Sequence, residues 1–340
     1  MDCIRRFRQF PSSRPAGRIV FCLLLVAGIT AALPAGDALA TRSEKRIVAV
    51  AANRIGTVDQ DPGCPDRGCY FGNGGNWCSE FVSWVYRRAG YPFSGGSRGG
   101  WLLNDTEKVR AWFEIHATYV TRDDPDWAGF TPRPGDYVFL GRADGLGGFT
   151  TRAHSGIVER LDADGTLRTI EGNNDDRPVG RYAYPSFRTN TTDNFPDGGI
   201  VLGFGLRGGK STRIPNGTAR ASSSGDGRPP ELAFDRRLDT FWRNRTHQGG
   251  GQYLEMDFNG AVTTVARIAL TFGNHYPDSY RFRFKKNGAW RWSRGVAGNR
   301  SKSRTHVWYR PRRNIQAVRV YSLRYSRDDY FSVYEMVIQR

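Results

Sequence analysis

The chain has 340 residues, of which 39% are hydrophobic, a proportion that suits a packed globular protein and excludes general disorder. Its length exceeds what one hydrophobic core usually supports, so we expect two domains. The formal net charge is +17, and it is unevenly divided: residues 1–40 contribute +3, residues 41–210 contribute zero and residues 211–340 contribute +14. The basic character therefore belongs to the C-terminal part of the chain.

The first forty residues have the order of a secretory signal peptide. Arginines come first, an apolar run follows from Ile19 to Leu33, and Ala38-Leu39-Ala40 provides a small-residue cleavage signal. The alternative is an uncleaved membrane anchor, although an apolar run of fifteen residues is short for a membrane span. We expect a secreted, wall-associated or periplasmic protein with no stable membrane anchor after cleavage.

Cysteine usage agrees with export. Beyond residue 40, Cys64, Cys69 and Cys78 remain, and an odd number leaves one thiol over if the other two pair. We expect a Cys64–Cys69 disulfide, because the turn-rich stretch 59–76 can fold back and bring the two Cα atoms to bonding distance. Cys78 then stays free, and a lone thiol in an oxidising compartment is a candidate nucleophile.

Two helical patterns precede a group of strands in residues 41–207. Apolar residues recur at helical spacing over Glu44–Ile55 and over Cys78–Ala89, and Gly90 ends the second pattern. Strand-like runs then follow at Asp136–Leu140, Ser155–Leu161, Leu167–Ile170 and Ile200–Phe204. Helices followed by antiparallel strands predict an α+β domain.

Cys78 has the surroundings that a nucleophile needs. It opens a helix directly after a glycine-rich stretch, where the helix dipole favours a thiolate and unpaired N–H groups can hold an oxyanion. His154 precedes one strand and Glu171 ends the next, so a hairpin turning at Asp162–Gly165 brings them together and lets Glu171 fix the imidazole tautomer. His116 competes as the base. On chemistry alone, two interpretations of Cys78 and His154 remain open: they form a catalytic site, or both are structural residues.

Four segments in register resemble the CHAP family, the cysteine, histidine-dependent amidohydrolases/peptidases, over residues 44–207. These segments are Trp77–Trp84, Pro134–Phe139, His154–Glu159 and Thr169–Asn173. The resemblance implies a papain-like fold and hydrolysis of amide or peptide bonds in peptidoglycan. It implies Cys78 as nucleophile, His154 as base, Glu171 as orienting residue and Asn173 as a supporting polar group, with no cofactor required for catalysis.

The stretch 59–76 departs from the family pattern and also permits a metal interpretation. Asp59, Asp61 and Asp66 offer oxygen ligands for Ca²⁺, but their spacing does not match an EF-hand loop. A zinc site has less support still, because the stretch lacks a paired cysteine and histidine set. We expect a solvated turn.

Residues 208–220 form the predicted linker, and residues 221–340 change to short strands separated by turns. The expected strands are Tyr253–Phe258, Val265–Phe272, Tyr280–Lys285, His306–Tyr309, Ala317–Tyr321 and Phe331–Ile338. Regularly spaced short strands with many aromatic residues predict an all-β jelly-roll or sandwich domain.

This second domain resembles a discoidin-like (coagulation factor type C) domain, a galactose-binding-like β-sandwich. The resemblance rests on Ala221–Ser224, Glu231–Asp235, Leu238–Trp242, Gly251–Phe258 and Val333–Glu335. It names an architecture and leaves the ligand open. Members often hold a structural Ca²⁺, which implies Asp235, Thr240 and Glu335 near a cation, although Arg236-Arg237 stand where related loops often carry glycine.

The charge of +14 in residues 211–340 predicts a surface for an anionic polymer. Aromatic residues are interleaved with the arginines and can stack on sugar faces: Trp290, Trp292, Trp308 and Tyr309. The alternative is a solvated basic surface over a core that contains these aromatics. We expect peptidoglycan or another anionic cell-wall polymer or glycan as partner, and no nucleic acid, since export disfavours it although the charge would fit.

Together these patterns predict a secreted cysteine hydrolase of peptidoglycan, targeted by a basic β-sandwich. One alternative is a non-catalytic glycan- or wall-binding protein whose cysteine domain has lost activity. Another is an amidase that acts on small peptides or polyamine conjugates. An amidase for the muramoyl-alanine bond and an endopeptidase for stem or bridge peptides would use the same residues.

Overall fold

The computed structural model describes residues 42–59, 71, 77–141, 153–189, 200–208, 212–214, 217–245, 251–273, 275–299, 303–325 and 330–340. All of them belong to the second of the chain's two compact units, Pro34–Arg340. The predicted signal peptide and the predicted disulfide between Cys64 and Cys69 lie outside the described residues, as do Asp61 and Asp66. No helix among the described residues is both long and apolar enough to cross a membrane.

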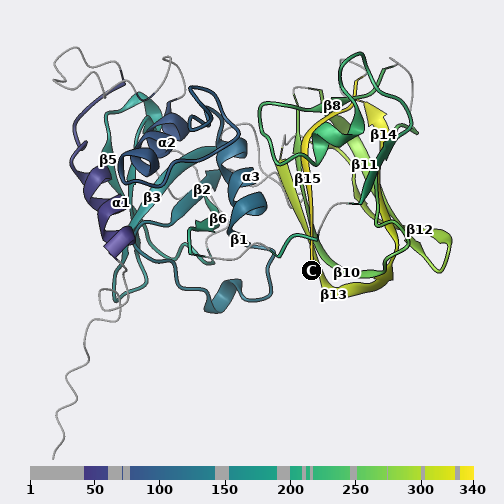
Figure 1. Ribbon diagram of the computed structural model, residues 1–340. Helices are drawn as coiled ribbons and strands as arrows, with labels where there is room; N and C mark the ends of the chain where they lie inside the picture. Colours follow the sequence, from purple (N-terminus) through teal and green to yellow (C-terminus); the bar gives the residue numbers. More distant parts are fainter. Residues whose placement is uncertain are drawn as a thin grey trace, which may run out of the picture. The chain divides into compact units, whose positions relative to one another are not determined.

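The N-terminal domain combines helices with one antiparallel sheet, which confirms the predicted α+β class (Figure 1). Its described elements are α1 (Arg42–Ala52), α2 (Cys78–Arg88), α3 (Thr106–His116), β1 (Thr118–Thr121), β2 (Tyr137–Gly141), β3 (His154–Leu161), β4 (Leu167–Glu171), β5 (Gly180–Tyr184) and β6 (Ile200–Leu206), with short 3₁₀ turns at Trp127–Gly129 and Asn174–Asp176. The strand order is β1-β6-β2-β3-β4-β5, and every neighbouring pair is antiparallel. This order places β3 and β4, which carry His154 and Glu171, next to each other.

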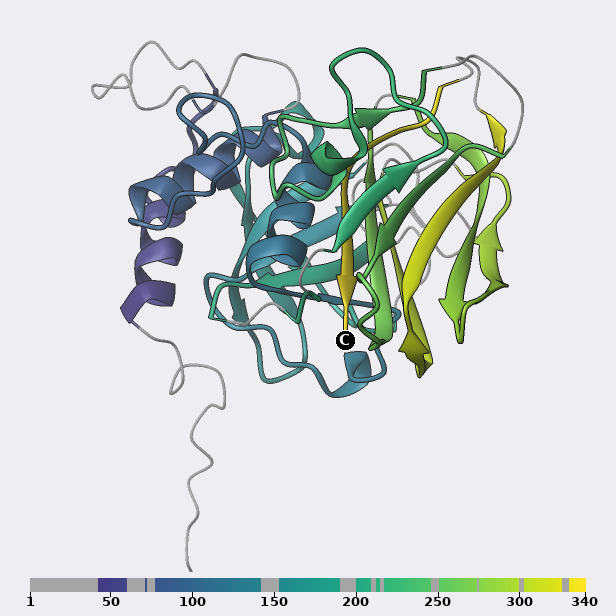
Figure 2. The same ribbon diagram turned by 45° about the vertical axis from the view of Figure 1, so that its right-hand side comes forward.

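Both faces of this sheet are buried. Alternate residues of β2 point to opposite sides, so that Tyr137 and Phe139 join the core beneath the helices while Val138 and Leu140 join a second, smaller core. α1 contacts α2, as both views show, and both helices contact β3 (Figure 2). The two central strands β2 and β6, which are covered on both sides, read as nearly continuous apolar runs, whereas the other strands are mixed.

The C-terminal domain is a sandwich of two antiparallel sheets, as predicted (Figure 1). Its strands are β7 (Thr218–Ala221), β8 (Trp242–Arg243), β9 (Tyr253–Asp257), β10 (Thr263–Phe272), β11 (Pro277–Lys286), β12 (Ala289–Val296), β13 (Ser303–Ile315), β14 (Ala317–Tyr325) and β15 (Ser332–Gln339), with a 3₁₀ turn at Pro230–Ala233. One sheet has the order β13-β10-β15-β8 and the other β12-β11-β14-β9-β7. A separate apolar core fills the space between them.

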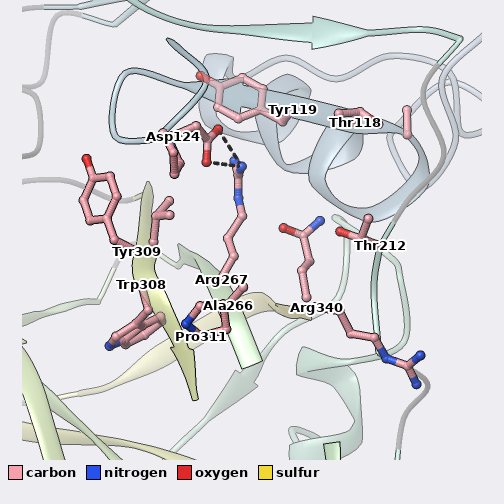
Figure 3. A pocket seen from close by; sticks show the side chains of 14 residues that line it. Thr118, Tyr119, Asp124, Thr212, Ala266, Arg267, Trp308, Tyr309, Pro311 and Arg340 are labelled. Carbon is pink, nitrogen blue, oxygen red and sulfur yellow. Dashed lines mark hydrogen bonds and ion pairs between the residues drawn. The ribbon is translucent and has the colours of Figure 1, made fainter. Parts of the chain in front are cut away.

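α3 is an element that the apolar pattern does not predict. Its buried face is charged: Arg110 and Glu114 are 2% and 1% exposed and form an ion pair one helical turn apart, with 3.4 Å between Nη2 and Oε1. Glu114 also pairs with Arg267 of β10 at 3.0 Å, and Arg267 reaches Asp124 at 2.8 Å (Figure 3). α3 also buries Val109, Phe113 and Ile115 in the core of the N-terminal domain, so the helix carries both apolar and ion-paired buried residues.

Candidate active site

Cys78 lies at the first position of α2. Its thiol is free and its side chain is buried, with 4% of the residue exposed. The preceding Trp77 packs against Gly172, directly after β4, where an added Cβ would come within 2.3 Å of the indole ring. Gly172 therefore allows the close approach that brings the start of α2 to the end of β4.

The hairpin of β3 and β4 brings His154 and Glu171 together. Gly156 lies opposite Glu171 in the register, and His154 Nε2 is 3.1 Å from Glu171 Oε2. A Cβ at Gly156 would be 2.7 Å from Glu171 Cγ, so glycine leaves the space through which the glutamate side chain reaches the histidine. The predicted hairpin and its turn are thus present, with the two ends in contact.

Glu171 is fully buried and surrounded by hydrogen-bond donors. Besides His154, its carboxylate accepts hydrogen bonds from Tyr184 Oη at 2.8 Å, from Asn174 Nδ2 at 2.7 Å and from the Thr169 hydroxyl. Each carboxylate oxygen thus faces two donors. A buried carboxylate with this many donors is held in one orientation.

The protonation of His154 is set by both of its neighbours. Burial of the ring on its own lowers the pKa of His154, whose side chain is 20% exposed. The charge of the Cys78 thiolate, a hydrogen bond with Cys78, and the hydrogen bond and charge of Glu171 act in the opposite direction and raise the pKa to about 10. At neutral pH this geometry favours an imidazolium beside the sulfur.

The arrangement provides the parts of a nucleophilic cysteine site. Glu171 engages Nε2 of His154, and Cys78 lies close enough to the same ring to raise its pKa. The positive end of α2 and the backbone N–H groups of its first turn lie at the same point. A thiolate, a proton donor and a set of oxyanion donors can therefore act on one carbonyl group.

Sequence reasoning missed three of the groups around Glu171. Asn174, one residue after the predicted Asn173, bonds to the carboxylate, whereas Asn173 is buried in a left-handed backbone conformation with φ of 59°. Thr169 precedes Glu171 by two positions on the same strand face, so period-two spacing carries a signal for it. Tyr184 comes from β5, a strand that the sequence reading did not predict, and no local motif points to it.

The other candidates have different surroundings. His116 ends α3 and packs against Trp112, with 5.2 Å between ring centroids. Asp59 accepts a hydrogen bond from the backbone N–H of Phe71 at 2.8 Å. The described residues contain no group of three or more histidine, cysteine or acidic side chains placed to hold a metal ion.

The predicted calcium ligands of the second domain make contacts of their own. The Thr240 hydroxyl donates to Asp235 Oδ2 at 2.7 Å, and Glu335 forms an ion pair with Arg213 at 3.1 Å. Burial raises the pKa of Glu335, and the charge of Arg213 opposes that shift. Because an arginine already supplies the positive charge beside Glu335, the side chains as they lie do not fit a Ca²⁺ site. The calcium stays a prediction.

Comparison with known families agrees with both sequence resemblances. Residues 70–173 match the model of the CHAP domain, and residues 218–336 match that of the F5/8 type C domain. The chain carries a CHAP domain followed by an F5/8 type C domain. The first match includes Cys78, His154 and Glu171 and indicates a general amidase or peptidase activity; the second indicates carbohydrate binding. The predicted domain boundaries at residues 40, 207 and 220 remain predictions.

Several solved carbohydrate-binding modules resemble the C-terminal domain. Chitosan-binding module 1 of a chitosanase/glucanase from Paenibacillus sp. IK-5 is 20% identical, with 38% of this chain and 97% of that chain covered and a TM-score of 0.35. The family 32 module of NanJ from C. perfringens, solved with galactose, is 19% identical, with 36% and 93% covered and a TM-score of 0.33. No curated protein matches the sequence significantly.

Proposed function

We propose that this protein is a secreted cysteine hydrolase that cleaves amide or peptide bonds in peptidoglycan. The observation that carries the proposal is the contact of His154 with the buried Glu171, beside a free thiol at the start of α2. The export part rests on the order of the first forty residues. The C-terminal domain, with its charge of +14, holds the enzyme on an anionic wall polymer or glycan.

The first half of the reaction forms a thioester. The Cys78 thiolate attacks the carbonyl carbon of the scissile amide, and backbone N–H groups at the start of α2 stabilise the resulting oxyanion. The His154 imidazolium gives its proton to the amide nitrogen, the C–N bond breaks, and the amine leaves. Neutral His154 and an acylated Cys78 remain, and Glu171 keeps the ring in place throughout.

The second half releases the acid. Water takes the place of the amine, and neutral His154 accepts a proton from it as the oxygen attacks the thioester carbon. The C–S bond breaks, the carboxylic acid product leaves and gives its proton to the solvent, and the thiolate–imidazolium pair is restored. The cycle needs no cofactor and consumes one water molecule for each bond cut.

The aromatic residues of the second domain divide into two groups. Trp292 and Tyr309 are 46% and 69% exposed and support the proposed contact with sugar faces. Trp308 is buried and packs edge-on against Phe282 and Phe284, at centroid distances of 5.7 and 5.5 Å. For Trp308 the alternative of a core residue under a basic surface is therefore correct.

The decisive experiment compares the wild-type protein with Cys78→Ala on purified peptidoglycan. We expect the variant to keep the fold, as judged by circular dichroism and thermal unfolding, and to lose at least about a thousandfold in the rate of muropeptide release. Mass spectrometry of the fragments identifies the bond cut. Release by Cys78→Ala at the wild-type rate would show that another residue is the nucleophile.

The same assay tests the alternatives. A wild-type protein that leaves peptidoglycan intact and cleaves small peptide or polyamine amides would support the small-substrate amidase. A wild-type protein that binds wall material and cleaves neither substrate would support the non-catalytic binding protein. Both outcomes use intact protein and need only the wild-type chain.

A further inference from the structure

One cavity of the C-terminal domain collects positive charge without counter-charge. It has a volume of about 350 Å³ and lies between the β11–β12 hairpin and the end of β13. The cations that line it are Lys286, Arg291, Arg310, Arg312 and Arg313. None of the described residues that line it is acidic. These five residues are called the basic pocket below.

Two irregularities in β13 create the basic pocket. In a regular strand, Arg310, Arg312 and Arg313 would not all line one cavity, because side chains alternate between the two faces. The register of β13 against β10 shifts on both sides of the pair Val265–Arg312, and Pro311 and the left-handed Asn314 lie within the shifted segments. Such bulges redirect side chains, and here they gather the arginine run on the cavity.

The charges of the basic pocket are unpaired in the described part of the chain. No carboxylate there forms an ion pair with any of its five cations, and the buried Nε of Arg312 has no hydrogen-bond partner among the described residues. Elsewhere in the same domain arginines are paired, as Arg213 is with Glu335 and Arg319 with Glu255. The basic pocket therefore places five cations that lack an ion-pair partner among the described residues around one cavity.

The walls hold the cations in place. The Arg312 guanidinium stacks over Phe284, with 5.2 Å to the ring centroid, and Phe284 and Ile315 are buried. Asn287 and Gly288 join β11 to β12 with positive φ at both positions, a tight turn that fixes Lys286 and Arg291 on the opposite wall. A stacked guanidinium loses little freedom when it binds an anion, which favours binding.

We propose that the basic pocket binds a phosphate group of a phosphate-containing wall polymer. This deepens the proposed function and rests on it, since it names the chemistry by which the second domain recognises its wall polymer. Guanidinium groups bind phosphate and carboxylate through two parallel hydrogen bonds. Phosphate suits this pocket better because its tetrahedral oxygens accept donors from several directions, whereas a carboxylate offers two coplanar oxygens to cations on opposite walls.

The test uses the full chain with Cys78→Ala, so that binding is measured without hydrolysis. The pocket variant is Arg310→Gln/Arg312→Gln/Arg313→Gln, and the control Arg220→Gln/Arg245→Gln/Arg281→Gln removes three exposed arginines that do not line the pocket. The two variants have the same net charge. The probes are poly(glycerol phosphate), polygalacturonate and single-stranded DNA at equal charge concentration, measured by calorimetry across a salt series.

We expect the pocket variant to bind poly(glycerol phosphate) about tenfold or more weakly, and the slope of log K against log salt to fall by about 2 to 3. The control should change affinity by less than about threefold. Polygalacturonate and DNA should bind the parent about tenfold or more weakly than the phosphate polymer. If the triple variant unfolds, the double variant Arg310→Gln/Arg313→Gln replaces it, because it leaves the stacked Arg312 in place. Its affinity for poly(glycerol phosphate) should also fall.

Three results would overturn the proposal. Equal losses of affinity in the pocket and control variants would support targeting by overall charge and rule out the basic pocket as a specific site. Equal or tighter binding of polygalacturonate or DNA, lost in the pocket variant, would assign the pocket to another polyanion. Binding that is unchanged in both variants and at high salt would rule out both the basic pocket and the electrostatic part of the proposed function.

Discussion

Replacement of Glu171 by glutamine tests how the carboxylate acts on His154. The substitution keeps the shape of the side chain, and the hydroxyls of Thr169 and Tyr184 can rotate to accept from the new amide, so the fold should persist. What is lost is a fully buried negative charge 3.1 Å from His154 Nε2. A charge-assisted hydrogen bond of this kind contributes about 1.5–3 kcal/mol.

This magnitude predicts the direction and size of the change in the pH profile. At about 1.4 kcal/mol for each pKa unit, the pKa of His154 should fall by about 1 to 2 units from its value of about 10. Because the pKa of His154 is raised in the folded protein, the stabilising ion pair is fully present below about pH 6.5 and is lost as pH rises through about 10. In Glu171→Gln both this loss and the alkaline fall of kcat/KM should move to lower pH by about 1 to 2 units, and kcat/KM at neutral pH should fall about ten- to hundredfold.

The assay is a pH profile of kcat/KM on a soluble muropeptide, with thermal unfolding recorded at each pH. Tyr184→Phe is the matched control, because it removes one hydrogen bond to Glu171 and leaves the carboxylate charge in place. Its alkaline limb should shift by less than about half a unit. An alkaline limb that stays at the wild-type pH in Glu171→Gln would refute the electrostatic role of Glu171.

Two further predictions concern the rest of the chain. Alkylation of the denatured, unreduced protein after signal cleavage should label Cys78 only, because Cys64 and Cys69 are expected to pair; mass spectrometry that finds three labels, or a label on Cys64 or Cys69, would rule that pairing out. Binding of the full-length Cys78→Ala protein to insoluble wall should weaken steeply as salt rises from 0.05 M to 1 M, since the Debye length falls to about 3 Å at 1 M. Binding that is unaffected by salt and competed by a free monosaccharide would instead indicate lectin-like recognition.

The sequence predicts those parts of the fold in which local pattern and tertiary burial agree. α2 was expected over Cys78–Ala89 and spans Cys78–Arg88, and the hairpin of β3 and β4 has the predicted turn. α3 was not predicted although it buries Val109 and Phe113, and the long-range ion pair between its Glu114 and Arg267 leaves no mark in the local sequence. β12 was also not predicted; it is an edge strand in which Ser293 is buried and the other residues are exposed or half-buried.

The candidate site divides in the same way. Cys78, His154 and Glu171 lie in segments whose motifs and strand order place them together, so their proximity follows from the predicted hairpin and helix. The donors that hold Glu171 are less accessible to sequence reasoning. Tyr184 reaches the carboxylate from β5, and its contribution depends on a strand pairing that no motif marks.

Net charge illustrates why composition alone identifies a binding surface poorly. A value of +14 for residues 211–340 counts every arginine equally. In the structure, Arg213, Arg267 and Arg319 are engaged with carboxylates, so they stabilise the fold and contribute little to the field outside it. The arginines of the basic pocket lack such partners among the described residues, and a bulged strand directs them into one cavity. The attraction for a polyanion therefore depends on where arginines lie without neighbouring carboxylates. The pocket variant and the control variant have the same net charge, so comparing them separates this local effect from the effect of total charge.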